Sequence, residues 1–464
     1  MRSHALKGED RIREEVTLQC PWASIIPPWC VFERPGPNVV SGLLIHQHPT
    51  SDNSLSSDNG LPVNERGALH YPVWFALGLA FMTAGSACAQ EDEHLEKVRR
   101  VLSATPLFDG HNDLAWAIRE QEGEPHSVQA YDLRGTTAGH TDIARLRTGM
   151  VGAQFWSVYV DMASVEVGAA RVQLEQIDIA RQFIRSYPDV FEQAYTTSDV
   201  NRIFRSGRIG SVLGMEGGHV LENSLGALRA FYDLGARYMT LTHGGNTDWA
   251  DSATDDPEHG GLTEFGKEVV REMNRLGMLV DLSHTSTETM NDVLDVTEAP
   301  VIFSHSGVQG LTDHRRNVPD QVLRRLPENG GVVMVVFYPW HVSEALRTYD
   351  GPDDPPWATL FDVADHIEYV REVAGIDHVG LGADYDGMEP DPPPVGLEDV
   401  SKYPALLVEL SRRGWNEDDL AKLAGGNILR AWGVAEDAAA RIQAQRGPSN
   451  ATIEELDGGT QAGN

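Results

Sequence analysis

Cysteine is scarce in this chain. Among its 464 residues only three are cysteines, Cys20, Cys30 and Cys88, and all three precede residue 90. The remaining sequence therefore contains no disulfide framework, no cysteine-ligated zinc and no catalytic thiol. Any metal held by this part of the chain must be bound by histidine, aspartate and glutamate.

Basic residues are also few relative to acidic ones. The 37 lysines and arginines are outnumbered by 69 aspartates and glutamates, which gives a formal net charge of −32. This charge disfavours nucleic acid and anionic membranes as partners, because both are themselves negatively charged. A strongly acidic composition otherwise serves to keep a protein soluble. The hydrophobic content of 41% is that of a globular protein.

No hydrophobic run in the N-terminal part is long enough for a comfortable transmembrane span. The uncharged run YPVWFALGLAFMTAG at 71–85 is too short to cross a bilayer. Small residues and then charges follow it, the pattern of a signal peptide over residues 67–89 with cleavage before Gln90. We therefore expect an exported protein, periplasmic or secreted, without a transmembrane or lipid anchor. A lipoprotein linked through Cys88 is disfavoured, because no leucine lies three residues before it.

Residues 1–66 precede this segment, although a signal peptide normally begins within a few residues of the initiator. They contain proline, serine, asparagine and scattered charges without sustained periodicity, which is typical of disorder. Two interpretations remain open. The residues form a disordered N-terminal extension, or the start is misassigned and the true one is near Leu61 or Val63.

Apolar, β-rich runs alternate with helical stretches from about residue 100 onward. Eight runs occur: TPLFDGH, GAQFWSVYV, IGSVLGMEGG, ARYMTLTHGG, GMLVDLSH, APVIFSHS, GGVVMVVFYPW and HVGLGADYDG. Several are continuous runs of valine, leucine and isoleucine, as buried parallel strands require. The helices expected between them include 165–186, 260–276, 286–297 and 358–374.

Eight strand–helix units predict an α/β fold, a (β/α)8 TIM barrel of the metal-dependent hydrolase type, over residues 90–436. A doubly wound open sheet is the alternative, and it is disfavoured because no G-x-G-x-x-G motif follows the first run. The polar, glycine-rich residues 437–464 are expected to form a flexible tail.

Histidines and carboxylates terminate six of the eight runs. The residues at these ends are His111, Asp113, Glu216, His243, His284, His305 and Asp384. In a barrel, chemistry takes place at the C-terminal ends of the strands. A lone histidine at a strand end is usually a hydrogen-bonded loop residue. The informative observation is therefore that all seven histidines and carboxylates lie at the C-terminal ends of expected strands.

A metal site explains this placement. A carboxylate that ends an apolar strand, such as Glu216, needs a counter-charge that a cation supplies. Three histidines and two carboxylates exceed the ligands of one tetrahedral zinc with an open position. They suit two metal ions that share one carboxylate, with a hydroxide between the ions. Asp384 and His243 then remain for proton transfer and charge stabilisation.

Two arginines follow the sixth run, in the segment DHRRNVPD that contains Arg315, Arg316 and Asn317. The functional interpretation is a guanidinium group that binds a carboxylate through two parallel hydrogen bonds. The alternative is a solvated basic loop.

Together these motifs resemble one enzyme family. The segments DGHNDLAW, GMEGGH, TLTHGGNTDWADS, VDLSHTS, VIFSHS, RRNVPD and GLGADYDG occur in family order and look like the membrane dipeptidase (renal dipeptidase) family, peptidase family M19, in a bacterial-type member. The resemblance extends over residues 95–435. It implies a (β/α)8 barrel that binds two Zn²⁺ ions and hydrolyses small dipeptide substrates.

The resemblance also implies roles for individual residues. The expected zinc ligands are His111, Asp113, Glu216, His284 and His305, with Glu216 bridging both ions. The substrate-contacting positions of the family match His243, Arg316 and Asp384. A metal-bridging hydroxide would attack the scissile carbonyl, while His243 stabilises the oxyanion and Asp384 passes the proton to the leaving amine. Arg316 would bind the C-terminal carboxylate of the substrate.

Some features depart from the animal members of this family. The chain after residue 90 has no cysteine, and its C-terminal IEELDGGTQAGN has no hydrophobic tail. Neither a disulfide-linked dimer nor a glycolipid anchor is therefore expected, and a homodimer without a disulfide remains open. The segments THGG and FYPWH (337–341), the second expected to line the pocket, also differ and leave the preferred dipeptide open.

Two competing hypotheses remain beside a dipeptidase. The first is another dinuclear amidohydrolase, such as a deacylase or lactonase, and the second is a non-catalytic zinc-binding protein. No lysine ends the fourth run, where a carbamylated bridge would lie, and Glu216 fills that role. Both candidate proton-transfer residues, Asp384 and His243, are present. These observations favour the dipeptidase.

Overall fold

The computed structural model describes residues 93–388 and 390–458 of the chain. Residues 1–66 and 67–89, for which the sequence predicts an extension and a signal peptide, lie outside the described residues. In the described ranges, none of the helices has both the length and the apolar character that a membrane crossing requires.

Eight parallel strands form a closed barrel. They are β1 (Leu107–Asn112), β2 (Val151–Ser157), β4 (Ile209–Glu216), β5 (Ala236–Thr240), β6 (Leu279–Asp281), β7 (Ile302–Ser306), β8 (Val332–Val335) and β9 (Val379–Leu381). They are hydrogen-bonded in the order β2-β1-β9-β8-β7-β6-β5-β4, and a further pairing of β2 with β4 closes the ring. Each strand overlaps one of the eight expected runs, so the predicted (β/α)8 fold is confirmed.

One short strand was not expected from the sequence. Strand β3 (Phe191–Gln193) pairs in parallel with the first residues of β4, with Phe191 opposite Ile209. It has only three residues, and only Phe191 among them is buried. So short a segment has no apolar run that would distinguish it from a loop.

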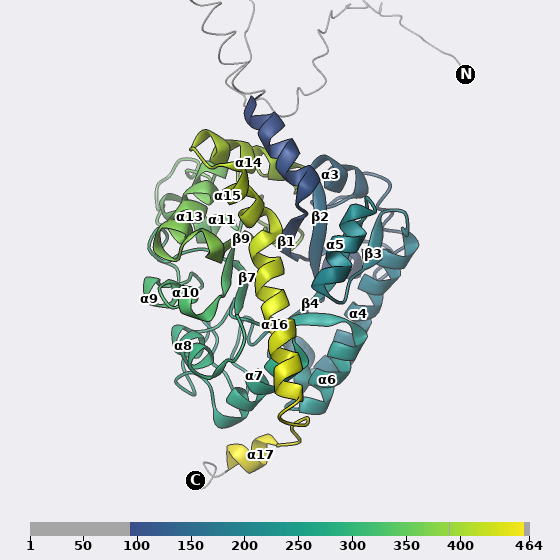
Figure 1. Ribbon diagram of the computed structural model, residues 1–464, viewed down its shortest axis with the longest axis vertical. Helices are drawn as coiled ribbons and strands as arrows, with labels where there is room; N and C mark the ends of the chain where they lie inside the picture. The colour runs from purple at the N-terminus through teal and green to yellow at the C-terminus, as the bar shows by residue number, and fades with distance from the viewer. Residues whose placement is uncertain (1–92, 389, 459–464) are drawn as a thin grey trace, which may run out of the picture. The chain divides into compact units, whose positions relative to one another are not determined.

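Helices cover the outside of the barrel (Figure 1). The longer ones are α4 (Ala169–Ser186), α5 (Thr197–Arg205), α6 (Leu225–Leu234), α7 (Glu264–Leu276), α8 (Thr287–Val296), α13 (Leu360–Val373), α14 (Tyr403–Arg412) and α16 (Asn427–Gln443). The shorter ones are α2 (Leu114–Glu120), α3 (Ile143–Thr148), α9 (Asp320–Leu323), α10 (Leu326–Asn329), α11 (Pro339–Val342), α12 (Glu344–Arg347), α15 (Glu417–Ala421) and α17 (Ile453–Leu456). The four helices predicted by range correspond to α4, α7, α8 and α13.

Side-chain caps fix where several of these helices begin. Thr196, Thr263 and Ser286 precede α5, α7 and α8, and each side-chain oxygen accepts a hydrogen bond from a backbone N–H of the first turn. A cap of this kind satisfies a donor that the helix itself leaves free, which stabilises it by about 1 kcal/mol. Gly277, with φ of 80°, then ends α7 in the left-handed conformation that glycine adopts without strain.

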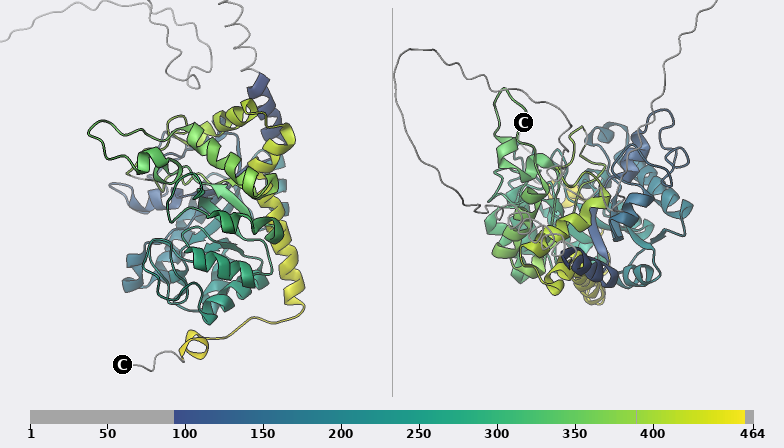
Figure 2. Two further views of the ribbon diagram at one scale, coloured as in Figure 1. Left: turned by 90° about the vertical axis from the view of Figure 1, so that its left-hand side faces the viewer. Right: turned by 90° about the horizontal axis from the view of Figure 1, so that it is seen from above.

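Helix α16 closes one end of the barrel interior. Its Trp432 ring lies 6.0 Å from the ring of Phe155 in β2, and Phe155 stacks on Phe108 of β1 at 4.8 Å. Tyr238 of β5 also packs against Phe155, with the ring centroids 4.9 Å apart. In the left view of Figure 2, α16 runs along the right-hand edge of the domain. The opposite end, where the strands finish, is left for the site.

The expected boundary of a loose tail at residue 437 does not coincide with the end of this helix. Helix α16 continues to Gln443, because Ala438, Ala439 and Ile442 are buried. Their spacing extends an apolar face along the helix, which the polar composition of the segment conceals. The side chain of Gln443 also donates a hydrogen bond to the carbonyl oxygen of Arg275, at 2.7 Å.

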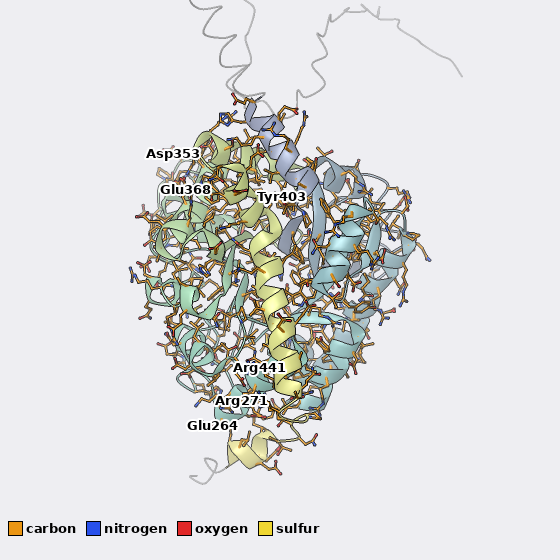
Figure 3. The ribbon with its side chains drawn as sticks, viewed as in Figure 1. Glu264, Arg271, Asp353, Glu368, Tyr403 and Arg441 are labelled. Atoms are coloured by element: carbon orange, nitrogen blue, oxygen red, sulfur yellow. The ribbon has the colours of Figure 1, made fainter. Side chains whose placement is uncertain are left out.

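Residues beyond α16 also contact the barrel helices. Arg446 donates to the carbonyl oxygen of Arg271 on α7, and Asp457 accepts hydrogen bonds from the hydroxyl of Thr263 at 2.7 Å and the backbone N–H of Glu264 at 3.1 Å. Arg271 and Glu264 are both labelled in Figure 3. A carboxylate at this place compensates the positive end of the α7 dipole. The described residues up to Asp457 thus contact the barrel helices, and the flexibility expected beyond residue 437 stays a prediction.

Candidate active site

The strand ends bring the seven expected histidines and carboxylates to one end of the barrel. Glu216 is the last residue of β4, and Asp113 follows β1 directly. His243, His284 and Asp384 each lie three residues beyond the end of their strands, β5, β6 and β9. The remaining two, His111 and His305, belong to β1 and β7 themselves.

Glu216 lies at the centre of this cluster and is 4% exposed. Its Oε2 atom is 3.3 Å from Nε2 of His111. Its Oε1 atom is 3.1 Å from Nε2 of His284 and 3.4 Å from Nε2 of His305. Burial opposes the charged form of Glu216, yet the facing histidines hold its pKa well below its usual range. The two carboxylate oxygens thus face two different sets of side chains.

The first set consists of His111 and Asp113 with Oε2 of Glu216. Nε2 of His111 is 3.1 Å from Oδ2 of Asp113, and its Nδ1 is 2.8 Å from the hydroxyl of Tyr238. Among the described residues, Nε2 of His111 and Oδ1 of Asp113 are buried and have no hydrogen-bond partner. Buried polar atoms are almost always satisfied, so this pair of atoms fits a bound cation.

The second set consists of His284 and His305 with Oε1 of Glu216. The Nε2 atoms of the two histidines are only 3.0 Å apart. Burial lowers the pKa of both imidazoles well below the ordinary value, so that two like charges do not meet here. His284 has a φ of 67°, a left-handed conformation that residues other than glycine seldom adopt and that recurs at functional sites.

Asp384 approaches the first set from β9. Its Oδ1 is 4.0 Å from Nε2 of His111. Burial raises the pKa of Asp384 well above its usual range, and the charges of Asp113 and Glu216 act in the same direction. Gly387 permits this approach, because a Cβ atom there would lie 2.7 Å from Oδ1 of Asp384 and 2.4 Å from Oδ2 of Asp113.

These residues form three overlapping groups that could hold a metal ion. The groups are His111, Asp113 and Glu216; Glu216, His284 and His305; and His111, His305 and Asp384. Within each group the donor atoms lie within 4.8 Å of one another. The donors are imidazole nitrogens and carboxylate oxygens, a set that suits divalent transition metals. Chemistry, burial and the unpartnered atoms all fit metal binding.

His243 lies beside the second set. Its Nε2 is 3.8 Å from Oε1 of Glu216, and its ring lies 4.7 Å from that of Tyr159 and 4.2 Å from that of His284. Burial lowers the pKa of His243 below its ordinary value. A neutral imidazole at this place retains one N–H that can donate to a ligand.

The hydrogen bonds that Arg316 donates within the described residues go to uncharged groups. Its guanidinium donates to the hydroxyl of Ser306 at 3.2 Å and to the carbonyl oxygen of His305 at 3.3 Å. It is 3% exposed, and burial lowers its pKa to about 10, which leaves it charged at neutral pH. No carboxylate in the described part of the chain forms an ion pair with it. A buried charge needs such a partner, so the group can accept an anionic ligand.

A cavity of about 250 Å³ joins these side chains. Its lining includes all the expected residues except His111, together with two aromatic residues that the sequence did not single out, Trp116 and Tyr159. Tyr338 and His341 also line the cavity, so the expected contribution of FYPWH to the pocket is confirmed. Trp116 and Tyr159 lie shortly after the ends of β1 and β2, and this position is their only sequence signal, which does not by itself distinguish a pocket residue from a core residue.

The family comparison agrees with this geometry. The model of the membrane dipeptidase family, peptidase family M19, matches residues 95–446. The chain belongs to this family. It is accordingly a metallo-dipeptidase, a hydrolase that acts on dipeptides.

Solved structures of similar proteins support the assignment. The "probable dipeptidase PvdM" from Pseudomonas aeruginosa is 25% identical, with a TM-score of 0.67 over 75% of this chain and 100% of that one. A metallopeptidase from Rhodobacter sphaeroides, liganded with a phosphinate mimic of the dipeptide L-Ala-D-Ala, is 25% identical, with a TM-score of 0.63 over 71% and 99%. An M19 metallopeptidase described as dipeptidase AC is 26% identical, with a TM-score of 0.63 over 71% and 98%.

Proposed function

We propose that this M19 dipeptidase hydrolyses dipeptides with two Zn²⁺ ions that share the carboxylate of Glu216. The observation that carries the proposal is the division of the two Glu216 oxygens between two sets of side chains. His111 and Asp113 would hold one ion, and His284 and His305 the other. When bound, such a pair of ions polarises the scissile carbonyl and lowers the pKa of a water molecule.

Asp384 and His243 are the residues proposed to assist the reaction at either side of the scissile bond. The raised pKa of Asp384 suits a base that accepts a proton from the attacking water and returns it to the departing amine. The neutral imidazole of His243 can donate a hydrogen bond to the developing oxyanion. Both groups line the same cavity as four of the five candidate ligands, His111 being the exception.

Arg316 is proposed to bind the C-terminal carboxylate of the dipeptide. It is a buried, charged guanidinium that lines the cavity. A substrate carboxylate would supply the missing counter-charge and would accept charge-assisted hydrogen bonds. The cavity volume of about 250 Å³ is slightly smaller than the roughly 300 Å³ at which typical ligand pockets begin, which favours substrates as short as two residues.

Replacing Arg316 by methionine tests this role. A charge-assisted hydrogen bond contributes about 1.5–3 kcal/mol, which corresponds to a loss of roughly ten- to 150-fold in kcat/KM on free dipeptides. Dipeptide amides lack the partner charge and should lose much less. Steady-state kinetics on matched acid and amide substrates measures the difference, and zinc content per chain should not change.

Arg315 supplies the matched control, because it neighbours Arg316 and does not line the cavity. Arg315→Met should leave the acid-to-amide ratio at its wild-type value. Equal losses on acids and amides in Arg316→Met would assign Arg316 a structural role, and the substrate class would then return to other amidohydrolase substrates.

A dipeptide panel assayed with and without a chelator tests the function as a whole. We expect hydrolysis of free dipeptides, loss of activity in the chelator, and recovery on addition of zinc. N-acetylated dipeptides and lactones serve as comparison substrates for the deacylase and lactonase hypotheses. Preference for either of these over every dipeptide, or full activity in the metal-free protein, would refute the proposal.

Export is a further part of the proposal, and it rests on the sequence pattern at residues 67–89. The mature protein should begin at or near Gln90. N-terminal sequencing of the protein purified from its native host checks this position. Recovery of a chain that retains residues 1–62 would contradict both the cleavage and the misassigned start.

A further inference from the structure

Asp281, at the end of β6, is a buried carboxylate that does not face the cavity. It is fully buried, and in the described part of the chain it forms no ion pair. Four donors surround it instead. The hydroxyls of Thr240 and Ser304 donate to Oδ2 at 2.5 and 2.6 Å, and the backbone N–H groups of Ser283 and Ser304 donate to Oδ1 at 3.1 and 2.8 Å.

Ser304 connects this carboxylate to one of the candidate ligands. Its Oγ lies 2.9 Å from Nδ1 of His305, the neighbouring residue in β7. A hydroxyl has a single proton, and the short contact with the Asp281 carboxylate takes it. Ser304 must therefore accept a hydrogen bond from His305, so that the proton of the imidazole is on Nδ1.

The other nitrogen of the ring faces the site. Nε2 of His305 is 3.4 Å from Oε1 of Glu216 and 3.0 Å from Nε2 of His284. With the proton on Nδ1, the lone pair of Nε2 is free to bind a cation. The reversed tautomer would place an N–H at this position and would prevent His305 from acting as a ligand.

We propose that Asp281 is a positioning residue, which acts through Ser304 to hold His305 in the tautomer that can bind metal. The inference rests on the proposed metal site and deepens it. A carboxylate or carbonyl behind a ligating histidine raises the basicity of the ligand and fixes the ring. Here the Asp281 carboxylate does not contact the imidazole directly. It fixes the direction of the Ser304 hydroxyl, and the hydroxyl oxygen in turn accepts the hydrogen bond from Nδ1 of His305.

Asp281→Asn and Ser304→Ala test the relay by two different routes. The asparagine keeps the size of the side chain but presents N–H groups to Ser304, which can then donate to His305 and reverse the tautomer. The alanine removes the hydroxyl altogether. Each variant should bind zinc about 10- to 100-fold more weakly, which is the usual cost of losing such a partner. Zinc titration against a competing chelator measures the affinity of each of the two sites.

Ser283→Ala provides a matched control. Ser283 belongs to the same network. Its hydroxyl accepts from the backbone N–H of His305 at 3.1 Å and lies 3.5 Å from the hydroxyl of Ser304, but among the described residues it has no hydrogen bond to the imidazole ring. This variant should keep zinc affinity within about twofold of wild type. The double variant of Asp281→Asn and Ser304→Ala should lose no more affinity than the weaker-binding single variant, because both changes interrupt one relay.

The melting temperature of the metal-free proteins distinguishes a specific effect of each substitution on His305 from a general loss of fold stability. The relay predicts a loss of zinc affinity in Asp281→Asn and Ser304→Ala in excess of any change in melting temperature. Unchanged zinc affinity in folded Ser304→Ala, or an equal loss in Ser283→Ala, would overturn the inference. Failure of the wild-type protein to bind zinc would refute the proposed function itself, and the inference with it.

Discussion

Glu216→Gln is expected to abolish binding of at least one zinc ion and to reduce turnover at least about a thousandfold. The substitution preserves the shape of the side chain but replaces one anionic oxygen by an NH₂ group, which cannot bind a cation. Because each oxygen of Glu216 faces a different set of ligands, either orientation of the amide deprives one set of its oxygen. A metal ion supplies several kcal/mol of transition-state stabilisation, and about 4 kcal/mol corresponds to a thousandfold.

Metal analysis of the purified variant and steady-state kinetics check this expectation together. Replacing any one of the histidine ligands should reduce turnover less than Glu216→Gln does. Each histidine belongs to only one of the two ligand sets, whereas Glu216 belongs to both. Glu222→Gln is a suitable control, because this exposed glutamate lies on the loop that follows Glu216. Two zinc ions per chain with near-normal turnover in Glu216→Gln would refute the bridging assignment.

Asp384→Asn is expected to lower kcat by about 10²- to 10⁴-fold, the usual contribution of a general base or acid. Asparagine cannot accept the proton of the attacking water. The backbone at this position tolerates the change well, because φ is 69° and asparagine is enriched in the left-handed region. The loss should therefore be chemical, with the melting temperature close to that of wild type.

Zinc stoichiometry decides between two roles of Asp384. The carboxylate also belongs to a possible metal-binding group with His111 and His305. Full zinc content with low kcat supports proton transfer, whereas loss of one ion would make Asp384 a ligand and leave the proton-transfer residue unassigned. Asp353→Asn, in an exposed loop labelled in Figure 3, should retain full kcat.

Much of the site could be predicted because a parallel barrel converts sequence position into spatial position. Every strand of the barrel points the same way, so residues at strand ends meet even when they are as far apart in sequence as His111 and Asp384. The structure brings all seven expected histidines and carboxylates together at one end of the barrel. The family motifs added Arg316, which lies on a loop and follows no strand directly.

Other features depend on contacts that no local pattern encodes. The division of the Glu216 oxygens follows from side-chain rotamers and from the packing of neighbouring strands. Trp116 and Tyr159 line the cavity from segments beyond the strand ends, where an aromatic residue could equally pack in the core. The continuation of α16 to Gln443 depends on a surface that only the folded barrel provides.

Closure of the barrel has a consequence for the order of events during synthesis. Strand β1 pairs with β9, with Asp109 opposite Leu381, so the ring of strands cannot close until residue 381 has left the ribosome. The end of the barrel interior that α16 covers cannot be closed until α16 has also been synthesised. All five candidate metal ligands, up to His305, have by then been translated. Until β9 has emerged, β1 and β8 each lack one neighbouring strand, and this late, non-local closure with two open edges makes such a nascent chain slow to fold and prone to aggregate. The candidate metal site would thus be assembled only after translation is nearly complete, and products that terminate early would contain the candidate ligands without the geometry that unites them.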